Sequence, residues 1–456
     1  MVASVMNINV DARNSSVEPA VLVMGMGVTG ASCARFFAAR GIVAEFVDSR
    51  QSPPGMDEIM DAMPDARVYP GGQSVELRPA VQKLVVSPGV DLNGPQIVAA
   101  RQRNIDIVSD IDLFAAECTG QIVAITGSNG KSTVTSMLGG MLSDLGWSVA
   151  TGGNLGTPAL DLLDPETEIF VLELSSFQLE RSRLVPAAVS VLLNLSPDHL
   201  DQHTNMDAYA SAKARVYCAC RHAVLNRDIP EFASFVPSAT TMTSFGLGEP
   251  ATREFGIRVT SRGECIAHGD TLLMSVDEFP LLGRHNLSNA LAALALGSVL
   301  GANPHGLAQA LKRYRGLPHR MQMVAEVNGV TWINDSKATN VGAALTSVQS
   351  IEDPFILIAG GDSKGASFEA LATALAARQC SAILIGRDAP SMSRALEREC
   401  DVMIVPTMRD AVVSAREMSK QGDTVLLAPA CSSHDMFANY AERGDAFATA
   451  VKEANS

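Results

Sequence analysis

The chain has 456 residues, of which 47 % are hydrophobic and 18 % are charged. At ~150 residues per domain, this length predicts about three domains. The composition excludes a disordered or fibrous protein, because each of those classes needs a different balance of residues. Acidic residues outnumber basic ones, 49 to 35, for a net charge of −14. That balance argues against nucleic-acid and anionic-membrane partners, since both require a positive surface.

The cysteines and the N-terminal residues indicate the compartment. None of the eight cysteines forms a C-x-x-C pair, which favours reduced thiols in a reducing environment. Residues 1–16 lack a basic stretch followed by an apolar core, so we expect no secretory signal. The longest apolar stretch, near 290–302, is too short to span a bilayer. We therefore expect a soluble cytoplasmic protein.

A repeating unit recurs along the chain: a short apolar run, a loop with Gly or Asp, and a segment with helical period. Runs this apolar are typical of strands covered on both faces, so they predict parallel sheets with flanking helices. Residues 251–280 differ, because alternation and turn signals there predict two or three antiparallel strands. The apolar runs lie at 20–25, 44–48, 83–87, 121–126, 168–174, 189–195, 354–361, 381–386, 402–405 and 424–428.

The first glycine-rich loop, VLVMGMGVTG at 21–30, joins a predicted strand to a predicted helix. Asp48 closes the next strand, as in the dinucleotide-binding fingerprint. NAD and a UDP-sugar both present a diphosphate that fits this pattern. A tight turn needed only for packing would also explain the glycines. The candidate diphosphate ligands are Val28, Thr29, Gly30, Ser49 and Arg50.

The second glycine-rich loop, GSNGKST at 127–133, also lies between a predicted strand and a predicted helix. Backbone N–H groups in such a loop can hold phosphates, while Lys131 can reach the β- and γ-phosphates and Ser132 can bind Mg²⁺. The full phosphate-loop pattern fails, because Ile125 stands where its first glycine belongs. The alternative is a turn that caps a helix, with a solvated lysine. The candidate phosphate ligands are Gly127, Ser128, Asn129, Gly130, Lys131, Ser132 and Thr133.

Glu173 stands near the end of an apolar run, where a carboxylate is costly unless it binds a cation or a donor. Its place after a phosphate loop resembles the acidic position that holds Mg²⁺ in ATPases. SPDHLDQH at 196–203 ends the next run, and its oxygens and imidazoles could complete a magnesium site. A zinc site would need a third ligand, and a solvated helix-capping loop is the plainer alternative, above all for His203. By pattern alone, Lys213 is an ordinary surface lysine.

Taken together and in this order, these motifs resemble the Mur ligase family, ATP-dependent amide-forming enzymes of peptidoglycan assembly. The resemblance covers nearly the whole chain, and it implies the member that adds D-glutamate to UDP-N-acetylmuramoyl-L-alanine. The similar stretches are MGMGVTG (24–30), VVSPGV (85–90), TGSNGKST (126–133), GGNLG (152–156), ELSSFQLE (173–180), SPDHLDQH (196–203), GRHNLSNALAA (283–293), LPHRMQ (317–322), NDSKATN (334–340), GGDSKG (360–365) and LAPACSSHDMF (427–437).

The resemblance implies an α/β protein of three domains. A Rossmann-like UDP-binding domain would span 1–110, and a central ATP-binding domain with a mixed sheet and a small antiparallel addition would span 111–316. A Rossmann-like amino-acid-binding domain would span 317–456. The implied partners are the two substrates, ATP and two Mg²⁺ ions, for a monomer that binds neither nucleic acid nor membrane.

The resemblance also implies roles for single residues, with Lys131, His199 and Lys213 as the catalytic ones. Ser132 would hold one Mg²⁺, while Glu173, His199 and a carbamylated Lys213 would hold the other. The UDP-substrate would contact Val28, Thr29, Ser49, Arg50, Gly89, Asn154 and His199. ATP would contact the phosphate loop together with Asn286, Arg320 and Asp335. Glutamate would contact Thr339, Lys364, Ser433, His434 and Tyr440.

The implied reaction begins with attack of the substrate carboxylate on the γ-phosphate of ATP, and the glutamate amine then displaces phosphate from the acyl-phosphate. Three alternatives stay open on the sequence. One is another Mur-type or a folylpolyglutamate-type ligase. A second is an NAD-dependent oxidoreductase, which explains residues 21–50 and nothing after them. A third is a non-catalytic ATP-binding switch protein.

Overall fold

The computed structural model describes residues 19–72, 77–154, 156–196, 203, 205–281 and 283–454. It contains three sheets, of five, nine and six strands. The chain divides into two compact units, Met1–Val276 with Asn289–Lys312 and Asp277–Ser288 with Arg313–Ser456. Within the described ranges, no helix has both the length and the apolar character that crossing a bilayer requires.

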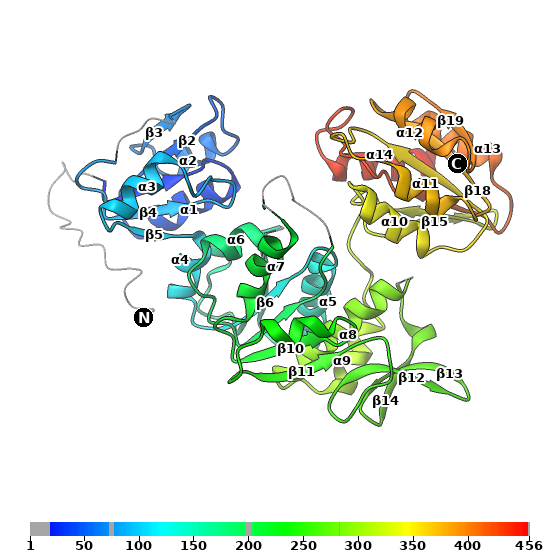
Figure 1. Cartoon of the computed structure of the whole chain (residues 1–456), viewed down its shortest axis with the longest axis horizontal. Coiled ribbons are helices and arrows are strands. Elements are labelled where there is room, and N and C mark those ends of the chain that lie inside the picture. Colours follow the sequence, from blue (N-terminus) through cyan, green and yellow to red (C-terminus); the bar gives the residue numbers. More distant parts are fainter. Residues whose placement is uncertain are drawn as a thin grey trace. The chain divides into compact units, whose positions relative to one another are not determined.

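The first sheet is parallel throughout, with the order β3-β2-β1-β4-β5 (Figure 1). Alternate residues of each strand enter two different cores: Val21 and Val23 pack on one face, whereas Leu22 and Met24 pack on the other. Both faces are therefore apolar, as the uninterrupted hydrophobic runs predict. The elements are β1 (Val21–Met24), α1 (Val28–Ala38), β2 (Ala44–Asp48), α2 (Met56–Ala62), β3 (Arg67–Pro70), β4 (Lys83–Val86), α3 (Pro95–Gln102) and β5 (Asp106–Val108).

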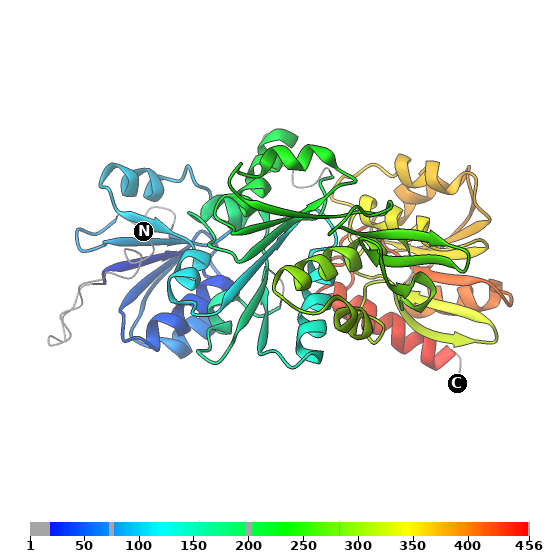
Figure 2. The ribbon, with the colours of Figure 1, turned by 90° about the horizontal axis from the view of Figure 1, so that it is seen from below.

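The central sheet has the order β14-β13-β12-β11-β10-β9-β6-β8-β7. Its strands from β7 to β11 are parallel, and β12, β13 and β14 add two antiparallel hairpins, seen in green in Figure 2. The antiparallel addition expected within 251–280 is thus confirmed. The strands are β6 (Gln121–Thr126), β7 (Val149–Gly153), β8 (Ile169–Glu173), β9 (Val189–Leu192), β10 (His222–Asn226), β11 (Thr241–Phe245), β12 (Phe255–Thr260), β13 (Gly263–His268) and β14 (Thr271–Ser275).

Helices α5, α6 and α7 connect strands of this sheet, whereas α4 precedes β6 and α8 and α9 follow β14. Helix α5 contacts the sheet at β6, β7 and β8 and packs against α9, while α6 packs against α7. The helices are α4 (Asp110–Glu117), α5 (Lys131–Asp144), α6 (Ser176–Arg181), α7 (Met206–Ala214), α8 (Arg284–Val299) and α9 (Pro304–Leu311), with short 3₁₀ turns η2 (Ala159–Leu162), η3 (Arg215–Tyr217), η4 (Pro230–Phe235) and η5 (Val276–Glu278).

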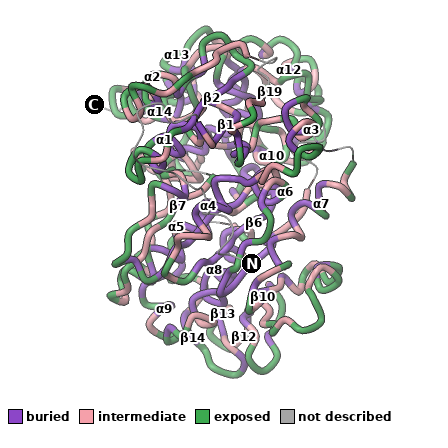
Figure 3. Tube along the Cα trace, turned by 90° about the vertical axis from the view of Figure 1, so that its left-hand side faces the viewer, coloured by how far each residue is buried: buried purple, intermediate pink, exposed green. Residues whose placement is uncertain are grey.

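The third sheet has the order β15-β16-β20-β17-β18-β19, and only β15 runs antiparallel to its neighbour. Alternate residues again serve two cores, with Leu357 on one face and Ile356 and Ile358 on the other. Figure 3 shows inner strands such as β1, β2 and β6 drawn largely as buried. The elements are β15 (Gln322–Val327), β16 (Val330–Asn334), α10 (Val341–Gln349), β17 (Phe355–Gly360), α11 (Glu369–Leu375), β18 (Cys380–Ile385), α12 (Ala389–Leu396), β19 (Asp401–Ile404), α13 (Met408–Met418), β20 (Thr424–Leu427) and α14 (Tyr440–Ala454).

Every apolar run that predicted a strand contains one, and the three-domain α/β architecture is confirmed. The sequence missed a group of strands that are shorter, more polar or more exposed. The pattern of exposure explains two of them, because β3 and β15 are edge strands with half-exposed residues and so lack a continuous apolar run. The strands absent from the prediction are β3, β5, β7, β10, β11, β15 and β16.

Asp110 is a buried carboxyl at the first position of α4. Its Oδ1 atom has no hydrogen-bond partner within the described part of the chain. Burial raises the pKa of Asp110 from 3.8 to about 7. The folded protein therefore holds this proton more tightly than the unfolded chain does, and the stability that the proton provides is lost as pH rises through that range.

We expect Asp110→Asn to stabilise the protein above pH 7, because an amide imitates the neutral carboxyl and avoids burying a charge. The gain should be on the order of 2–4 kcal/mol at pH 8, at 1.36 kcal/mol per pKa unit, and it should shrink as pH falls toward 5. Urea unfolding at both pH values measures it. Asp65→Asn, at an exposed position, is the matched control and should have no such pH-dependent effect. Equal stability of Asp110→Asn and the parent protein at pH 8 would contradict the assignment.

Candidate active site

The glycine-rich loop after β1 packs closely on the loop after β4. Gly25 has a φ of +99°, and a Cβ there would lie 2.7 Å from the Cβ of Ser87. A Cβ on Gly30 would lie 2.2 Å from the carbonyl oxygen of Gly25. These glycines are therefore needed for the turn and for the approach of the two loops, whatever ligand the loops bind.

The carboxylate of Asp48 accepts its hydrogen bonds from residues of the first sheet's own loops. It accepts hydrogen bonds from the Met26 amide at 2.7 Å and from the Arg50 Nη2 atom at 2.6 Å. The hydrogen bond from the Arg50 side chain is the main cause that lowers the pKa of Asp48 to about 2. In the dinucleotide fingerprint, the corresponding acid binds a ribose. Here it holds its own loop and the Arg50 guanidinium instead, which weakens the case for NAD.

The other UDP-site candidates of the first sheet lie around the carboxyl ends of its strands. Val28 begins α1 and is 65 % exposed, and Thr29 is half-buried beside it. Ser49 and Gly89 are exposed in the loops after β2 and β4. The strand order places β2 and β4 on either side of β1, so these loops are neighbours. This edge is where open parallel sheets bind ligands.

The phosphate loop joins β6 to α5, as predicted. Gly130 is the residue before α5, with a left-handed φ of +82°. A Cβ at this position would lie 2.4 Å from the Oδ1 atom of Asn289, so only glycine fits. Ser132 and Thr133 follow in the first turn of α5 and are buried. The N–H groups of that turn are the donors that the helix itself leaves for an anion.

Residues on neighbouring strand ends hold this loop in shape. The Ser128 amide donates to the Asn194 carbonyl oxygen at 3.0 Å, and the Asn129 amide donates to the Asn194 Oδ1 atom at 2.9 Å. The Ser128 Oγ atom donates to the Ser196 carbonyl oxygen at 3.0 Å and lies 3.1 Å from the Tyr209 hydroxyl. The loop is thus preorganised by contacts with the segment after β9 and with α7.

Two lysines meet at one carbonyl of the loop. The Lys131 Nζ atom donates to the carbonyl oxygens of Gly127 and Ser128 at 2.9 and 3.0 Å. The Lys213 Nζ atom also donates to the Gly127 carbonyl oxygen, at 2.9 Å, and lies 4.8 Å from the Tyr209 ring centroid. Lys213 is only 2 % exposed, so its interpretation as a surface lysine was wrong. Its helical neighbours gave no sign of burial.

Glu173 lies at the end of β8 and is 3 % exposed. Its Oε2 atom accepts a hydrogen bond from Ser132 Oγ at 2.5 Å, and its Oε1 atom accepts one from Asn154 Nδ2 at 2.9 Å. The structure therefore brings together the carboxylate, the phosphate-loop hydroxyl and the asparagine that the sequence singled out separately. Carboxylate and hydroxyl oxygens are the ligands that Mg²⁺ prefers, so these residues fit that ion.

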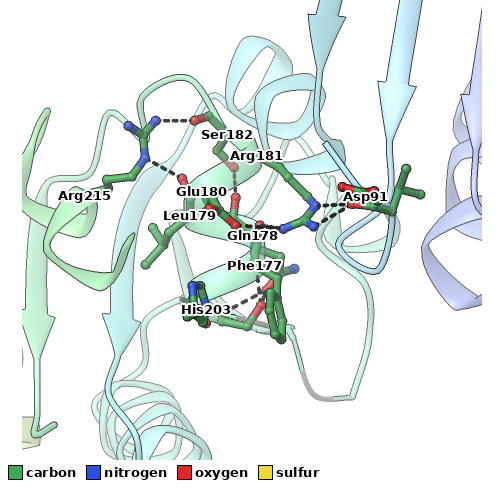
Figure 4. A network of polar contacts seen from close by, with 12 residues as sticks. Asp91, Phe177, Gln178, Leu179, Glu180, Arg181, Ser182, His203 and Arg215 are labelled. Carbon is green, nitrogen blue, oxygen red and sulfur yellow. Dashed lines mark hydrogen bonds and ion pairs between the residues drawn. The ribbon is translucent and has the colours of Figure 1, made fainter. Parts of the chain in front are cut away.

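The remaining acidic and histidine candidates divide into two groups. Asp198, His199 and Asp201 lie outside the described residues. His203 is described, and its Nε2 atom lies 3.0 Å from Ser176 Oγ. Its ring stacks on Phe177 with a centroid distance of 5.3 Å, so it is a packed structural histidine (Figure 4). Within the described part of the chain, no group of three or more His, Cys, Asp or Glu side chains could hold a metal.

The second unit gathers the candidate glutamate-binding residues on loops after three adjacent strands, β16, β20 and β17. The loops after β17 and β20 pair directly. The Asp362 amide donates to the Ser432 carbonyl oxygen at 3.0 Å, and the Ser432 amide donates to the Asp362 carbonyl oxygen at 2.9 Å. Thr339 follows β16, and the neighbouring Ala338 carbonyl oxygen accepts a bond from the Ala430 amide at 2.9 Å. Among the candidate residues, Lys364 and His434 are exposed, Ser433 is buried, and Thr339 and Tyr440 are half-buried.

Arg443 ties these loops together, although the sequence gave no signal for it. It is 1 % exposed, and its guanidinium donates to the Ser336 hydroxyl and carbonyl at 3.0 and 2.9 Å and to the Cys431 carbonyl at 3.1 Å. Burial lowers the pKa of Arg443 to about 10, so it stays charged at neutral pH. An arginine in an amphipathic helix such as α14 ordinarily faces solvent, which is why pattern alone could not find it.

The three nucleotide candidates of the second unit differ in their surroundings. Asp335 is buried, accepts the Met321 amide at 3.1 Å and is bonded by the Ser347 hydroxyl. Burial raises the pKa of Asp335 above its ordinary value. Arg320 is half-buried in the segment before β15, and Asn286 is buried in α8. Asp335 thus fixes the 319–321 segment, which carries Arg320.

Comparisons with known proteins agree across the whole chain. Models of the MurD-like N-terminal domain, the Mur ligase middle domain and the glutamate ligase domain match residues 19–109, 125–297 and 319–431. A UDP-N-acetylmuramoylalanine--D-glutamate ligase from Nitrosococcus oceani is 45 % identical over 96 % of this chain and 99 % of its own. The protein of the same name from Pseudomonas aeruginosa is 43 % identical over 95 % of this chain and 97 % of its own.

Solved structures share the fold at lower identity. The UDP-N-acetylmuramate-alanine ligase MurC from Thermotoga maritima has a TM-score of 0.60 at 17 % identity, covering 95 % of this chain and 99 % of that one. The MurF ligase from Thermotoga maritima in complex with ADP has a TM-score of 0.60 at 18 % identity, covering 90 % and 95 %. With three domain models in order and full-length relatives above 40 % identity, the chain belongs to the Mur ligase family.

Proposed function

We propose that this protein joins D-glutamate to UDP-N-acetylmuramoyl-L-alanine, with ATP cleaved to ADP and phosphate, in cytoplasmic peptidoglycan precursor synthesis. The observation that carries this proposal is the buried Glu173 carboxylate, which is hydrogen-bonded to Ser132 of a phosphate loop. The chain that contains it is 45 % identical to the UDP-N-acetylmuramoylalanine--D-glutamate ligase from Nitrosococcus oceani. A carboxylate placed there is suited to a cation that accompanies a nucleotide triphosphate. The three functional domains of the proposal span 1–110, 111–316 and 317–456.

ATP would be held by the loop at residues 127–133 and by Asn286, Arg320 and Asp335. Ser132 would hold one Mg²⁺, and Glu173, His199 and a carbamylated Lys213 would hold a second. Mg²⁺, when bound, supplies positive charge that offsets the charge of the phosphates. Lys131 would exchange its bonds to the loop carbonyls for bonds to phosphate oxygens.

The reaction requires one anion, the substrate carboxylate, to attack another, the γ-phosphate. The N–H groups at the start of α5 are fixed before the ligand arrives, so they lower this electrostatic barrier without reorganising, and the Lys131 ammonium adds positive charge once it turns from the loop carbonyls to the phosphate. The carboxylate oxygen bonds to phosphorus and ADP leaves, and the glutamate amine then attacks the acyl carbon and releases phosphate. Holding the acyl-phosphate away from water favours the amine over hydrolysis.

The loops after β16, β17 and β20 would bind the incoming amino acid. Lys364 has a positive φ of 51° and projects from an exposed turn, where its ammonium is suited to a carboxylate. Thr339, Ser433, His434 and Tyr440 complete the proposed pocket. The UDP end of the other substrate would lie on Val28, Thr29, Ser49, Arg50 and Gly89, with Asn154 near its peptide. The proposal takes the protein to act as a monomer.

Replacement of Lys131 tests the phosphate-loop assignment. Lys131→Ala should lower kcat for ATP-dependent phosphate release by on the order of 10²-fold or more, because a fixed positive charge beside the transferred phosphoryl group is lost. Phosphate release with both substrates and Mg²⁺ is the measurement. Lys420→Ala, at an exposed lysine, should behave as the parent. Near-normal turnover of Lys131→Ala would refute the assignment.

The glycine that precedes α5 offers a steric test. Gly130→Ala should weaken binding of a non-hydrolysable ATP analogue at least tenfold, because its Cβ would meet the Asn289 Oδ1 atom at 2.4 Å at a left-handed φ. Gly140→Ala, in the same helix with open space around its Cβ, should leave binding unchanged and stabilise the protein by up to about 1 kcal/mol. Calorimetric titration and thermal unfolding compare the two variants. Equal ATP-analogue affinity for both would remove the steric argument.

Replacement of Lys213 tests its proposed carbamylation. Lys213→Ala should lose activity, and added formate or acetate should restore part of it by supplying the missing oxygens. Lys131→Ala serves as the comparison, since a carboxylate cannot replace a cation and should give no recovery. Activity of Lys213→Ala that does not respond to carboxylates would argue for a structural lysine that only supports the Gly127 carbonyl.

A further inference from the structure

The turn after β4, residues 87–90, carries Gly89 of the proposed UDP site. It closes through a bond from the Val90 amide to the Ser87 carbonyl oxygen at 3.1 Å, and the Ser87 amide is held by the Met24 carbonyl oxygen at 3.0 Å. The position of Val90 therefore sets the direction of the exposed Gly89 backbone. A group that holds the Val90 carbonyl therefore restrains the turn that carries the Gly89 amide.

Arg181, at the end of α6, fixes that carbonyl. Its Nη2 and Nε atoms both donate to the Val90 oxygen, at 2.6 and 3.2 Å, and its Nη1 atom donates to the Phe177 carbonyl oxygen at 3.1 Å. The side chain is 9 % exposed, and the nearby carboxylates of Glu180 and Asp91 balance its charge. Figure 4 shows the guanidinium extending from α6 toward the segment that contains Asp91.

The other end of α6 leads to the phosphate loop. The Cζ atom of the Arg181 guanidinium lies over the Phe177 ring, 5.6 Å from its centroid. The Phe177 ring stacks on the His203 ring with an interplanar angle of 6°. His203 in turn lies 5.2 Å from the Tyr209 ring. The Tyr209 hydroxyl is 3.1 Å from Ser128 Oγ in the phosphate loop. These contacts form a continuous series from the Val90 carbonyl oxygen to the Ser128 hydroxyl.

We propose that α6 positions the two ligand loops with respect to each other, with Arg181 as a positioning residue for the UDP-substrate and the Phe177–His203 stack as its connection to the phosphate loop. This inference rests on the proposed function, because it takes the turn at 87–90 and the loop at 127–133 as binding sites for UDP and ATP. A ligand bound at either loop would restrict the motion of these contacting residues. The second ligand would then lose less conformational entropy on binding and would bind more tightly.

The proposal separates the effects of two substitutions. Arg181→Met keeps the aliphatic length and removes the bonds to the Val90 carbonyl, so KM for the UDP-substrate should rise about 5–20-fold, while kcat and the affinity for an ATP analogue bound alone should stay within about twofold. Arg183→Met is the matched control two residues further on. The Arg183 guanidinium pairs with Asp106 instead, so all three constants should match the parent.

The connection itself is tested by binding measured one ligand at a time and then together. In the parent protein, a non-hydrolysable ATP analogue should tighten UDP-N-acetylmuramoyl-L-alanine binding at least fivefold by calorimetric titration. Phe177→Leu changes a side chain that belongs to neither loop and should keep both single affinities, but the enhancement should fall below twofold. Phe177→Tyr retains the ring and should restore it.

The outcomes are distinguishable. If the parent binds neither ligand, the proposed function fails. If both bind but independently, or if Phe177→Leu keeps the full enhancement, the positioning role of α6 fails while the function stands. Should Phe177→Leu fail to fold, as judged by circular dichroism, Arg181→Met decides the matter, because an unchanged KM for the UDP-substrate would overturn the proposal.

Discussion

The structure depends most on the burial of one carboxylate at the end of a central strand. Glu173 pairs in register with Ile125 of β6 on one side and with Gly153 of β7 on the other. Its side chain therefore emerges between the phosphate loop, which follows β6, and Asn154, which follows β7. A carboxylate that is 3 % exposed is costly unless donors surround it, and Ser132 and Asn154 supply those donors. Strand order, loop position and site chemistry are thus consequences of one another.

A second constraint, the lack of room for a Cβ atom, shapes the ends of the strands. Where a chain leaves a parallel strand and must turn back closely over its neighbour, a Cβ often does not fit. Gly25 after β1 and Gly361 after β17 both have positive φ values, and a Cβ on Gly361 would lie 2.2 Å from the Ser432 carbonyl oxygen. Glycine lets the backbone of one loop approach the next, which brings main-chain N–H groups together at the carboxyl edge. Each sheet can therefore present a polar site without disturbing its apolar interior.

The sequence predicted what depends on local pattern. Uninterrupted apolar runs gave the strands that are buried on both faces, and glycine spacing gave both loops. It could not predict contacts between residues that are far apart in the sequence and meet only in the folded chain. The burial of Lys213, the contact of Asn289 with Gly130 and the guanidinium of Arg443 each join residues that are distant in sequence. The hydrophobic pattern of a segment does not predict such long-range contacts, because each of these residues is ordinary within its own segment. The family resemblance named Lys213 for its role, but only the packing explains how it reaches the loop.

The two lysines at the Gly127 carbonyl are unequal partners. Lys131 begins α5 and is half-buried, so its side chain can leave the loop carbonyls for a phosphate. Lys213 is enclosed, with its ammonium 4.8 Å from the Tyr209 ring, and has little freedom to follow a ligand. A carbamate formed on Lys213 would keep one N–H on its nitrogen, so the bond to the Gly127 carbonyl could persist while the new oxygens extend beyond it. The proposed modification therefore changes the charge beside the phosphate loop without requiring the loop to lose its support.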